Sequence, residues 1–306
     1  MPISIEGEKI QTFSIVAGTK ACNARCPFCV SKMTPEQGID LKPEKINKKR
    51  FAKSYNYAVQ GKAETAMITG KGEPVLFPEH ISIYLNSMLG LAKKTGYKIP
   101  IKELQTNGIT IAEGRVDDYL HLWRAANLYT IAVSIVHFDS EVNRQIYLPH
   151  KSAYIDLPKL IDKLHEADFS VRLAVVLFKE GIDDATKLKK LIEFSKDNNV
   201  EQLTIRPVSM PDKSKNKKAS EWVRERTLED GQLQSMVNYL NEHGTVVKEF
   251  PFGGTVYSIY DVKYQNVCLT NCLTKDKPGG KYLRQLIFYP NGRIATDWTE
   301  ESEGLE

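Results

Sequence analysis

Short apolar runs alternate with longer amphipathic stretches over the first two thirds of the chain. The runs are rich in Val, Ile, Leu and Thr and have the length of strands. In the stretch LPKLIDKLHEA, apolar residues recur at the i, i+3, i+4 and i+7 positions of a helix face. The predicted strands are residues 11–17, 65–69, 101–106, 130–135, 170–178 and 202–207. The predicted helices between them are residues 43–60, 78–95, 116–126, 156–167 and 185–198.

A strand followed by a helix, repeated along the chain, predicts a parallel sheet with helices packed outside it. We therefore expect an α/β fold, a partial (β/α)6 TIM-like barrel, with a flat doubly wound sheet as the alternative. In a barrel of this kind the reactive side chains gather at the carboxyl ends of the strands.

The pattern changes after Pro207. The segment SMPDKSKNKKAS, residues 209–220, is polar and basic and predicts an exposed loop, and a helix is expected at residues 229–242. Near the end, the runs LRQLIFYP and RIATDW flank an Asn-Gly pair, which is the strongest short signal for a hairpin. We interpret residues 1–212 as a core partial barrel and residues 213–306 as a small C-terminal α/β appendage that helps to close its mouth.

The composition is typical of a soluble globular protein. Of the 306 residues, 42% are hydrophobic and 26% are charged, which excludes a mainly disordered chain or a collagen. No apolar stretch approaches the ~18 residues of a membrane span, and the N-terminal sequence shows no targeting pattern, so we expect a cytoplasmic protein without membrane association. A net charge of +4 neither requires nor excludes a nucleic-acid partner.

The cysteines fall into two groups. Cys22, Cys26 and Cys29 form a Cys-x3-Cys-x2-Cys motif directly after the first predicted strand. Three thiolates on one loop can bind three corners of a cube-shaped iron–sulfur cluster and leave one iron free. A structural zinc site normally has a fourth ligand, and the nearest histidine in the sequence is His80. Zinc binding and three unrelated buried cysteines are the alternatives.

The cysteine motif, with aromatic Phe28 before its last cysteine, resembles the signature of the radical S-adenosylmethionine (radical SAM) enzymes. The resemblance implies a [4Fe–4S] cluster on Cys22, Cys26 and Cys29 whose open iron binds SAM. It implies reductive cleavage of SAM to a 5′-deoxyadenosyl radical that abstracts hydrogen from an organic substrate, with flavodoxin or ferredoxin as electron donor. It also places Phe28 near the adenine or the cluster, although a core position for this ring is as consistent with the sequence.

A second motif supports the first. The stretch MITGKGEP places Gly70, Gly72, Glu73 and Pro74 directly after the second predicted strand, where glycines let the backbone approach a ligand. It resembles the Gly-Gly-Glu-Pro turn that holds the methionine amine of SAM in the family. Lys71 stands in the place of the first glycine of that motif.

Five further residues at strand ends are candidates for the SAM and substrate cavity. Thr106 and Asn107 resemble the Thr-Asn-Gly turn of the family, and Ser134 matches a serine that contacts the SAM ribose or carboxylate. Arg172 begins one predicted strand and Arg206 ends another, so either can contact SAM or substrate. A polar strand cap at residues 106–107 and a surface charge at Arg172 are the alternatives.

The second cysteine group lies near the C-terminus. Cys268 and Cys272 precede the predicted hairpin, and this layout resembles the SPASM or Twitch region that carries an auxiliary iron–sulfur cluster in some radical SAM enzymes. Asp297 occupies the position where that pattern has a third cysteine. Three interpretations stay open: a degenerate hairpin without a cluster, an auxiliary cluster on Cys268 and Cys272 with or without Asp297, and a redox-active or disulfide pair.

The motifs do not identify the substrate, because one fold hosts many reactions. A small metabolite or nucleotide is favoured, since no leader-peptide-binding domain is recognisable before the core. The lysines of residues 213–218 leave an RNA- or peptide-modifying enzyme open. A non-catalytic iron–sulfur or zinc scaffold or sensor is an alternative of another class. The turn at residues 72–74 argues against it, because a scaffold needs no site for an ammonium group.

Overall fold

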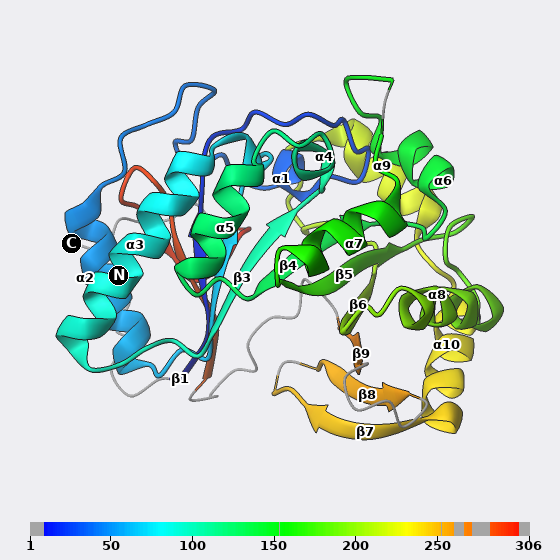
Figure 1. Ribbon diagram of the computed structural model, residues 1–306. Coiled ribbons are helices and arrows are strands. Elements are labelled where there is room, and N and C mark those ends of the chain that lie inside the picture. Colours follow the sequence, from blue (N-terminus) through cyan, green and yellow to red (C-terminus); the bar gives the residue numbers. More distant parts are fainter. Residues whose placement is uncertain (1–8, 153, 252, 260–265, 271–281, 300–306) are drawn as a thin grey trace.

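The computed structural model describes residues 9–299 except 153, 252, 260–265 and 271–281. Figure 1 shows a curved sheet with helices packed on its outer side. The strands are β1 (Lys9–Val16), β2 (Thr65–Thr69), β3 (Ile101–Thr106), β4 (Thr130–Ile135), β5 (Ser170–Leu177), β6 (Gln202–Pro207), β7 (Gly244–Glu249), β8 (Thr255–Ile259), β9 (Asn266–Leu269), β10 (Tyr282–Phe288) and β11 (Ile294–Ala295). The helices are α1 (Val30–Met33), α2 (Lys48–Gln60), η1 (Pro74–Leu76, 3-10), α3 (Pro78–Thr95), α4 (Ile109–Ala112), α5 (Asp117–Ala125), α6 (Ser140–Tyr147), α7 (Leu157–Glu166), α8 (Ala185–Asp197), α9 (Lys217–Arg226) and α10 (Asp230–His243).

The order of the strands confirms the predicted partial barrel. In the described residues one sheet runs β11-β10-β1-β2-β3-β4-β5-β6-β9-β8-β7, and β1 to β6 pair in parallel with their neighbours in sequence. A doubly wound sheet would reverse its strand order at a switch point. Because right-handed crossovers between strands in unbroken order put every helix on one side, the sheet curls with its helices outside.

The core lies between the sheet and this outer helix layer. Phe13 of β1 stacks on Phe51 of α2 with 5.9 Å between ring centroids, and Phe51 meets Phe288 of β10 at 5.1 Å. All three side chains are almost completely buried. Since side chains alternate along a strand, the residues between these core positions face the inside of the barrel.

Helix boundaries differ from the prediction in two places. The first predicted helix begins at residue 48 instead of 43, because the side chain of Asn47 accepts a hydrogen bond from Arg50 N and caps it. The predicted loop 209–220 is shorter than expected, because the helix α9 already begins at Lys217. Asn216 caps this helix by accepting a hydrogen bond from Ala219 N. The short helix α6 was not predicted at all.

The C-terminal residues extend the same sheet at both of its edges. Strand β10 pairs in parallel with β1, and β9 pairs in parallel with β6. The predicted hairpin is confirmed, since β11 pairs antiparallel with β10 around the Asn-Gly turn, where Gly292 has a φ of +89°. The appendage is therefore continuous with the barrel sheet, and the boundary at residue 212 stays a prediction.

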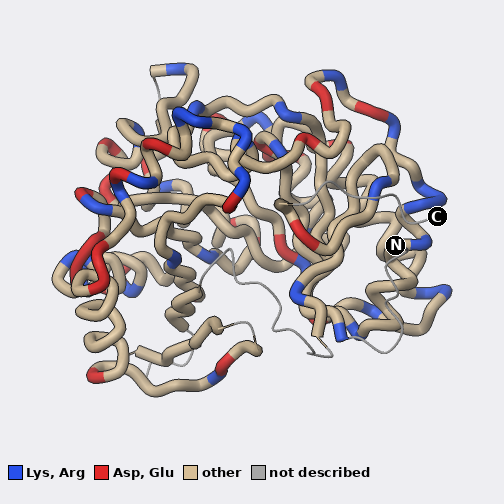
Figure 2. Tube along the Cα trace, turned by 180° about the vertical axis from the view of Figure 1, so that it is seen from behind, with Lys and Arg blue, Asp and Glu red and all other residues tan. Residues whose placement is uncertain are grey.

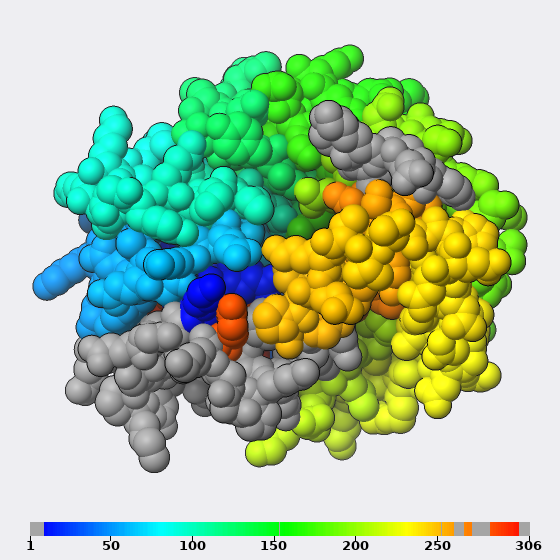
Figure 3. Space-filling view, turned by 90° about the horizontal axis from the view of Figure 1, so that it is seen from below, coloured from blue at the N-terminus to red at the C-terminus, as the bar shows by residue number. Residues whose placement is uncertain are grey.

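The two ends of the barrel are covered by different segments. At the lower end the β7–β8 hairpin, yellow to orange in Figure 3, lies beside the blue start of β1. There Lys248 of β7 forms an ion pair with Glu64, the residue before β2, with 3.6 Å between Lys248 Nζ and Glu64 Oε2. The helix α9 lies at the other end, where the cysteine loop follows β1.

Candidate functional site

The cysteine loop, residues 17–29, connects β1 to α1 at the carboxyl ends of the strands (Figure 1). It is held by the last residue of α6 and by the segment that follows this helix. Arg25 N donates a hydrogen bond to Tyr147 O at 2.9 Å, and His150 N donates to Asn23 O at 2.9 Å. Residues far apart in the sequence therefore fix the backbone that carries the three thiols.

The three thiols of this loop are free and half-buried. Burial raises the pKa of Cys22 to about 11, and it raises the pKa of Cys26 further, with the neighbouring thiolates adding to both shifts. Three thiolates so close together repel one another, so their deprotonation requires a positive partner such as a metal centre.

The donor set fits an iron–sulfur cluster. In the part of the chain that the structure describes, no three His, Cys, Asp or Glu side chains converge on a point where one ion would bind. A cluster does not require such convergence, because each cysteine binds a different iron at a different corner. The loop offers three sulfur ligands and no fourth.

Glu73 connects the two sequence motifs. Its side chain is 3% exposed, and its Oε1 accepts hydrogen bonds from Thr106 Oγ1 at 2.6 Å and Val75 N at 3.0 Å. Its Oε2 accepts a bond from Asn107 N at 2.9 Å, and its own N–H donates to Ala21 O at 2.9 Å. Burial raises the pKa of Glu73, and these donors oppose the shift. Glu73 thus joins three segments: its carboxylate links the turn after β2 to the turn after β3, and its backbone N–H links both to the cysteine loop.

The glycine turn directly follows β2, where the sequence places it. Gly70 and Gly72 precede Glu73, and Pro74 is buried at the start of η1. A Cβ on Gly72 would lie 2.0 Å from Ala21 O, so only glycine fits there. The carbonyl oxygens of residues 70–72 accept no hydrogen bond from any described residue and are available to a ligand.

Thr106 and Asn107 reach the cysteine loop directly. Asn107 Nδ2 donates to Asn23 Oδ1 at 2.7 Å and lies 3.9 Å from Cys22 Sγ. Asn107 Oδ1 accepts a hydrogen bond from Ile109 N at 3.1 Å, which fixes the amide orientation. These residues also cap the end of β3, so the capping role and the site role coincide.

Phe28 packs in an aromatic cluster. Its ring lies 5.9 Å from that of Tyr147 and 5.7 Å from that of Trp222, which belongs to α9. With 9% of its surface exposed, Phe28 anchors the loop before the last cysteine. No local motif indicates a role for Tyr147 or Trp222, because both reach the loop through tertiary contacts alone.

Arg172 faces the inside of the barrel. It lies on the opposite face of β5 to Val171 and Leu173, which join the helix-packed core, and it forms an ion pair with Glu103 of β3. The strand between them presents the small residue Ala132 in register with Arg172. The surface-charge alternative is therefore wrong. Arg172 Nε is buried and has no hydrogen-bond partner among the described atoms.

Arg206 and Ser134 are half-buried near the same interior. Burial raises the pKa of both Glu103 and Tyr147, and the Arg206 guanidinium opposes the shift in each. The charge of Arg206 is therefore close enough to act on both groups. Among the described residues, Arg206 forms no ion pair and the Ser134 hydroxyl forms no hydrogen bond.

Breaking the Glu103–Arg172 pair is expected to destabilise the fold. Glu103→Ala leaves a guanidinium inside the barrel without its carboxylate, and we expect a loss of about 3–5 kcal/mol in the free energy of unfolding. The double variant E103A/R172M recovers part of that loss, because it removes the orphaned charge as well. Urea denaturation of the apo-protein measures the free energy of unfolding of the single variants and of the double variant. Simple additivity of the two single substitutions would contradict the interpretation.

The C-terminal cysteines are only partly described. Cys268 lies within β9, pairs with Thr204 of β6 and has its thiol pKa raised by burial. Cys272 lies outside the described residues. Asp297 Oδ1 accepts hydrogen bonds from Thr299 N and Thr299 Oγ1. The auxiliary cluster on Cys268 and Cys272 stays a prediction.

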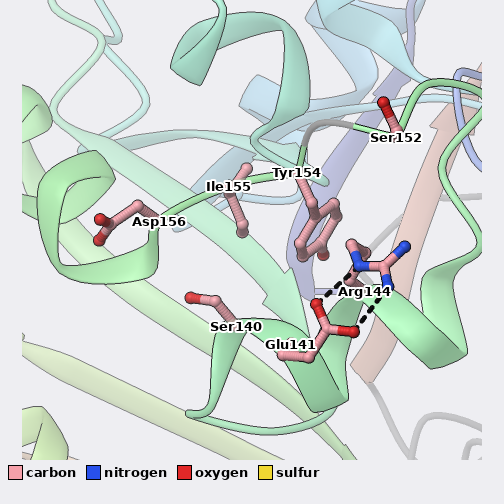
Figure 4. A pocket seen from close by; sticks show the side chains of 7 residues that line it. All are labelled: Ser140, Glu141, Arg144, Ser152, Tyr154, Ile155 and Asp156. Atoms are coloured by element: carbon pink, nitrogen blue, oxygen red, sulfur yellow. Dashed lines mark hydrogen bonds and ion pairs between the residues drawn. The ribbon is translucent and has the colours of Figure 1, made fainter.

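An open surface depression of about 510 Å³ lies beside α6 (Figure 4). Arg144 and Glu141, neighbours on α6, pair through hydrogen bonds of 2.7 and 2.6 Å. None of the predicted site residues lines it, so we assign it no part in the site. Its lining consists of Ser140, Glu141, Arg144, Ser152, Tyr154, Ile155 and Asp156.

Known proteins resemble this chain in structure. No protein-family model and no curated protein matches the sequence. Streptococcus suis SuiB bound to S-adenosylmethionine matches with a TM-score of 0.60 at 14% identity, over 97% of this chain and 63% of SuiB. SuiB alone gives 0.56 at 14% identity, and SuiB bound to the precursor peptide SuiA gives 0.53 at 17% identity, each over 95% of this chain and 60% of SuiB. The structural neighbours are radical SAM enzymes. The chain has the radical SAM fold.

The radical SAM fold agrees with the resemblance of the cysteine motif. At 14–17% identity the match establishes the fold. The chain spans between 60% and 63% of the length of SuiB, so the activity of a whole enzyme of that kind does not follow from the match. In the described residues, no helix combines the length and apolar character that a membrane crossing needs.

Proposed function

We propose that this protein is a radical SAM enzyme that binds a [4Fe–4S] cluster through Cys22, Cys26 and Cys29. The supporting observation is the network around Glu73. It joins the cysteine loop to the turn that holds the SAM amine in the family and to the turn that faces the SAM and substrate cavity there. The likeness of the fold to SuiB bound to S-adenosylmethionine supports the same assignment. When bound, the cluster supplies the open iron and the electron for cleavage of SAM to a 5′-deoxyadenosyl radical.

The residues of the chain have distinct roles in this proposal. Both oxygens of Glu73 already accept hydrogen bonds, so Glu73 positions the turn, and the free carbonyl groups of residues 70–72 receive the SAM amine. Asn107 orients the loop beside Cys22. Ser134 and Arg206 contact the carboxylate or ribose of SAM, or the substrate, with groups that have no partner in the described protein.

A small organic molecule is the first candidate for the substrate. The unpaired guanidinium of Arg206 at the end of β6 suits a carboxylate or phosphate group on such a molecule. A peptide is the second candidate, because SuiB has been solved with its precursor peptide. An RNA substrate has less support, since Figure 2 shows Lys and Arg interspersed with Asp and Glu along the trace. A flavodoxin or ferredoxin is the proposed electron donor.

Anaerobic cleavage of SAM tests the proposal. The reconstituted protein is incubated with dithionite and SAM, and 5′-deoxyadenosine is measured by mass spectrometry. We expect formation of 5′-deoxyadenosine, and a higher rate with a metabolite extract that contains the substrate. A protein that binds the cluster but neither binds nor cleaves SAM would be the scaffold or sensor, and the enzyme assignment would then be wrong.

A further inference from the structure

Lys71 is a buried cation beside the proposed cluster site. Lys71 lies in the turn after β2, and only 6% of its surface is exposed. Its Nζ donates a hydrogen bond to Thr34 Oγ1 at 2.7 Å. In the motif that this turn resembles, the position belongs to a glycine, which has no side chain to bury. The charge of Lys71 is therefore a property of this chain.

No carboxylate of the described residues forms an ion pair with Lys71. Glu36 is close enough to act on it, but Glu36 is exposed and pairs with Lys20 at 2.9 Å. Burial lowers the pKa of Lys71 to about 8, and the charges of Cys29 and Glu36 oppose the shift. A buried ammonium group with one neutral partner is costly unless another negative group compensates it.

The position of Thr34 places this charge near the thiols. Cys29 and Thr34 flank the short helix α1 as its N-cap and C-cap. This helix has four residues, and four helical residues rise only about 6 Å. The ammonium group therefore lies at the end of the short helix that Cys29 begins, close enough for the charge of Cys29 to act on it, and on a turn that Gly72 brings against Ala21.

We propose that Lys71 is the buried counter-charge of the iron–sulfur cluster and raises its reduction potential. This inference rests on the cluster of the proposed function. A [4Fe–4S] cluster on three thiolates is negatively charged and gains a further negative charge when it accepts one electron from a donor. A cation fixed in a region of low dielectric stabilises the reduced state more than the oxidised state.

The test is a potentiometric titration of the reconstituted protein without SAM, monitored by electron paramagnetic resonance. Lys71→Met removes the charge and keeps the length of the side chain, and Lys71→Arg keeps the charge. Lys102→Met is the matched control, because Lys102 is 3% exposed but donates to Ala126 O at 3.3 Å on the helix side of β3.

We expect K71M to lower the ratio of reduced to oxidised cluster at a given potential about tenfold, which is about 59 mV for one electron. The K71R and K102M proteins are expected to keep the potential of the unmodified protein. In the apo-protein, K71M does not lower the unfolding midpoint, because the charge that it removes has no counter-ion there. A large loss of apo-protein stability would indicate a purely structural role and overturn the inference.

The remaining outcomes separate the inference from the proposed function. If K71M binds the cluster with an unchanged potential, the counter-charge role is wrong and the proposed function stands. If K71M and Lys71→Gln both lose the cluster while K71R retains it, the requirement for positive charge supports the inference. If K71R loses it as well, the requirement is for the lysine itself, and the inference is overturned. If the unmodified protein takes up no cluster, the proposed function fails and the inference fails with it.

Discussion

Replacement of Cys22, Cys26 or Cys29 by alanine is expected to abolish both the broad iron–sulfur absorbance and the formation of 5′-deoxyadenosine. Each thiolate binds a different iron, and the described residues of the loop contain no further cysteine that could take its place. We expect less than a tenth of the iron per chain and no detectable product. Anaerobic reconstitution, visible absorbance and iron analysis measure the first effect, and mass spectrometry measures the second.

Cys268→Ala is the matched control for these variants. Its thiol is also half-buried and free, but it lies on β9 within the sheet. We expect the C268A protein to keep the cluster of the cysteine loop and the SAM cleavage. Iron content that falls by about half in C268A would instead support the auxiliary cluster. Full SAM cleavage in any variant of the loop cysteines would contradict the proposed function.

The sequence predicted the barrel because its signals are local. Most of the strands β1 to β6 are short runs rich in β-branched and apolar residues, clearest in β4 and β5, so their positions follow from the runs themselves. The edges of the sheet were not predictable in the same way. Strands β9 and β10 belong to the last quarter of the chain, and nothing in their composition indicates that they pair with β6 and β1.

In the candidate site, too, the contiguous motifs were predictable and the contacts between distant segments were not. The cysteine spacing and the Gly-Glu-Pro turn are contiguous motifs, and the sequence located both. The Glu103–Arg172 pair depends on the register of three strands and on a small residue at Ala132, which no local pattern encodes. The support of Phe28 by Trp222 depends on α9, whose lysine-rich start resembles a loop.

The role of Glu73 shows why the motif needs both its acid and its glycine. The carboxylate accepts three hydrogen bonds from residues after β2 and β3, and the backbone N–H of Glu73 holds the turn against the cysteine loop. That approach depends on the absence of a side chain at Gly72, which faces the backbone of Ala21. The cysteine loop and the turn after β2 are thus packed as one unit, and a change in either segment displaces the other.

Gly72→Ala is therefore expected to disrupt the SAM site. The added Cβ would lie 2.0 Å from Ala21 O and 2.7 Å from its carbonyl carbon, and backbone atoms cannot rotate away as a side chain can. The turn must move and break the Glu73 N to Ala21 O bond, so we expect a loss of about 2–3 kcal/mol in stability and at least tenfold weaker SAM binding. Gly90→Ala in α3, where an added Cβ meets nothing within 4 Å, is the control and gains up to about 1 kcal/mol. Urea denaturation and equilibrium binding of SAM measure the two effects. Equal behaviour of the two alanine variants would show that the close approach of turn and loop is not required.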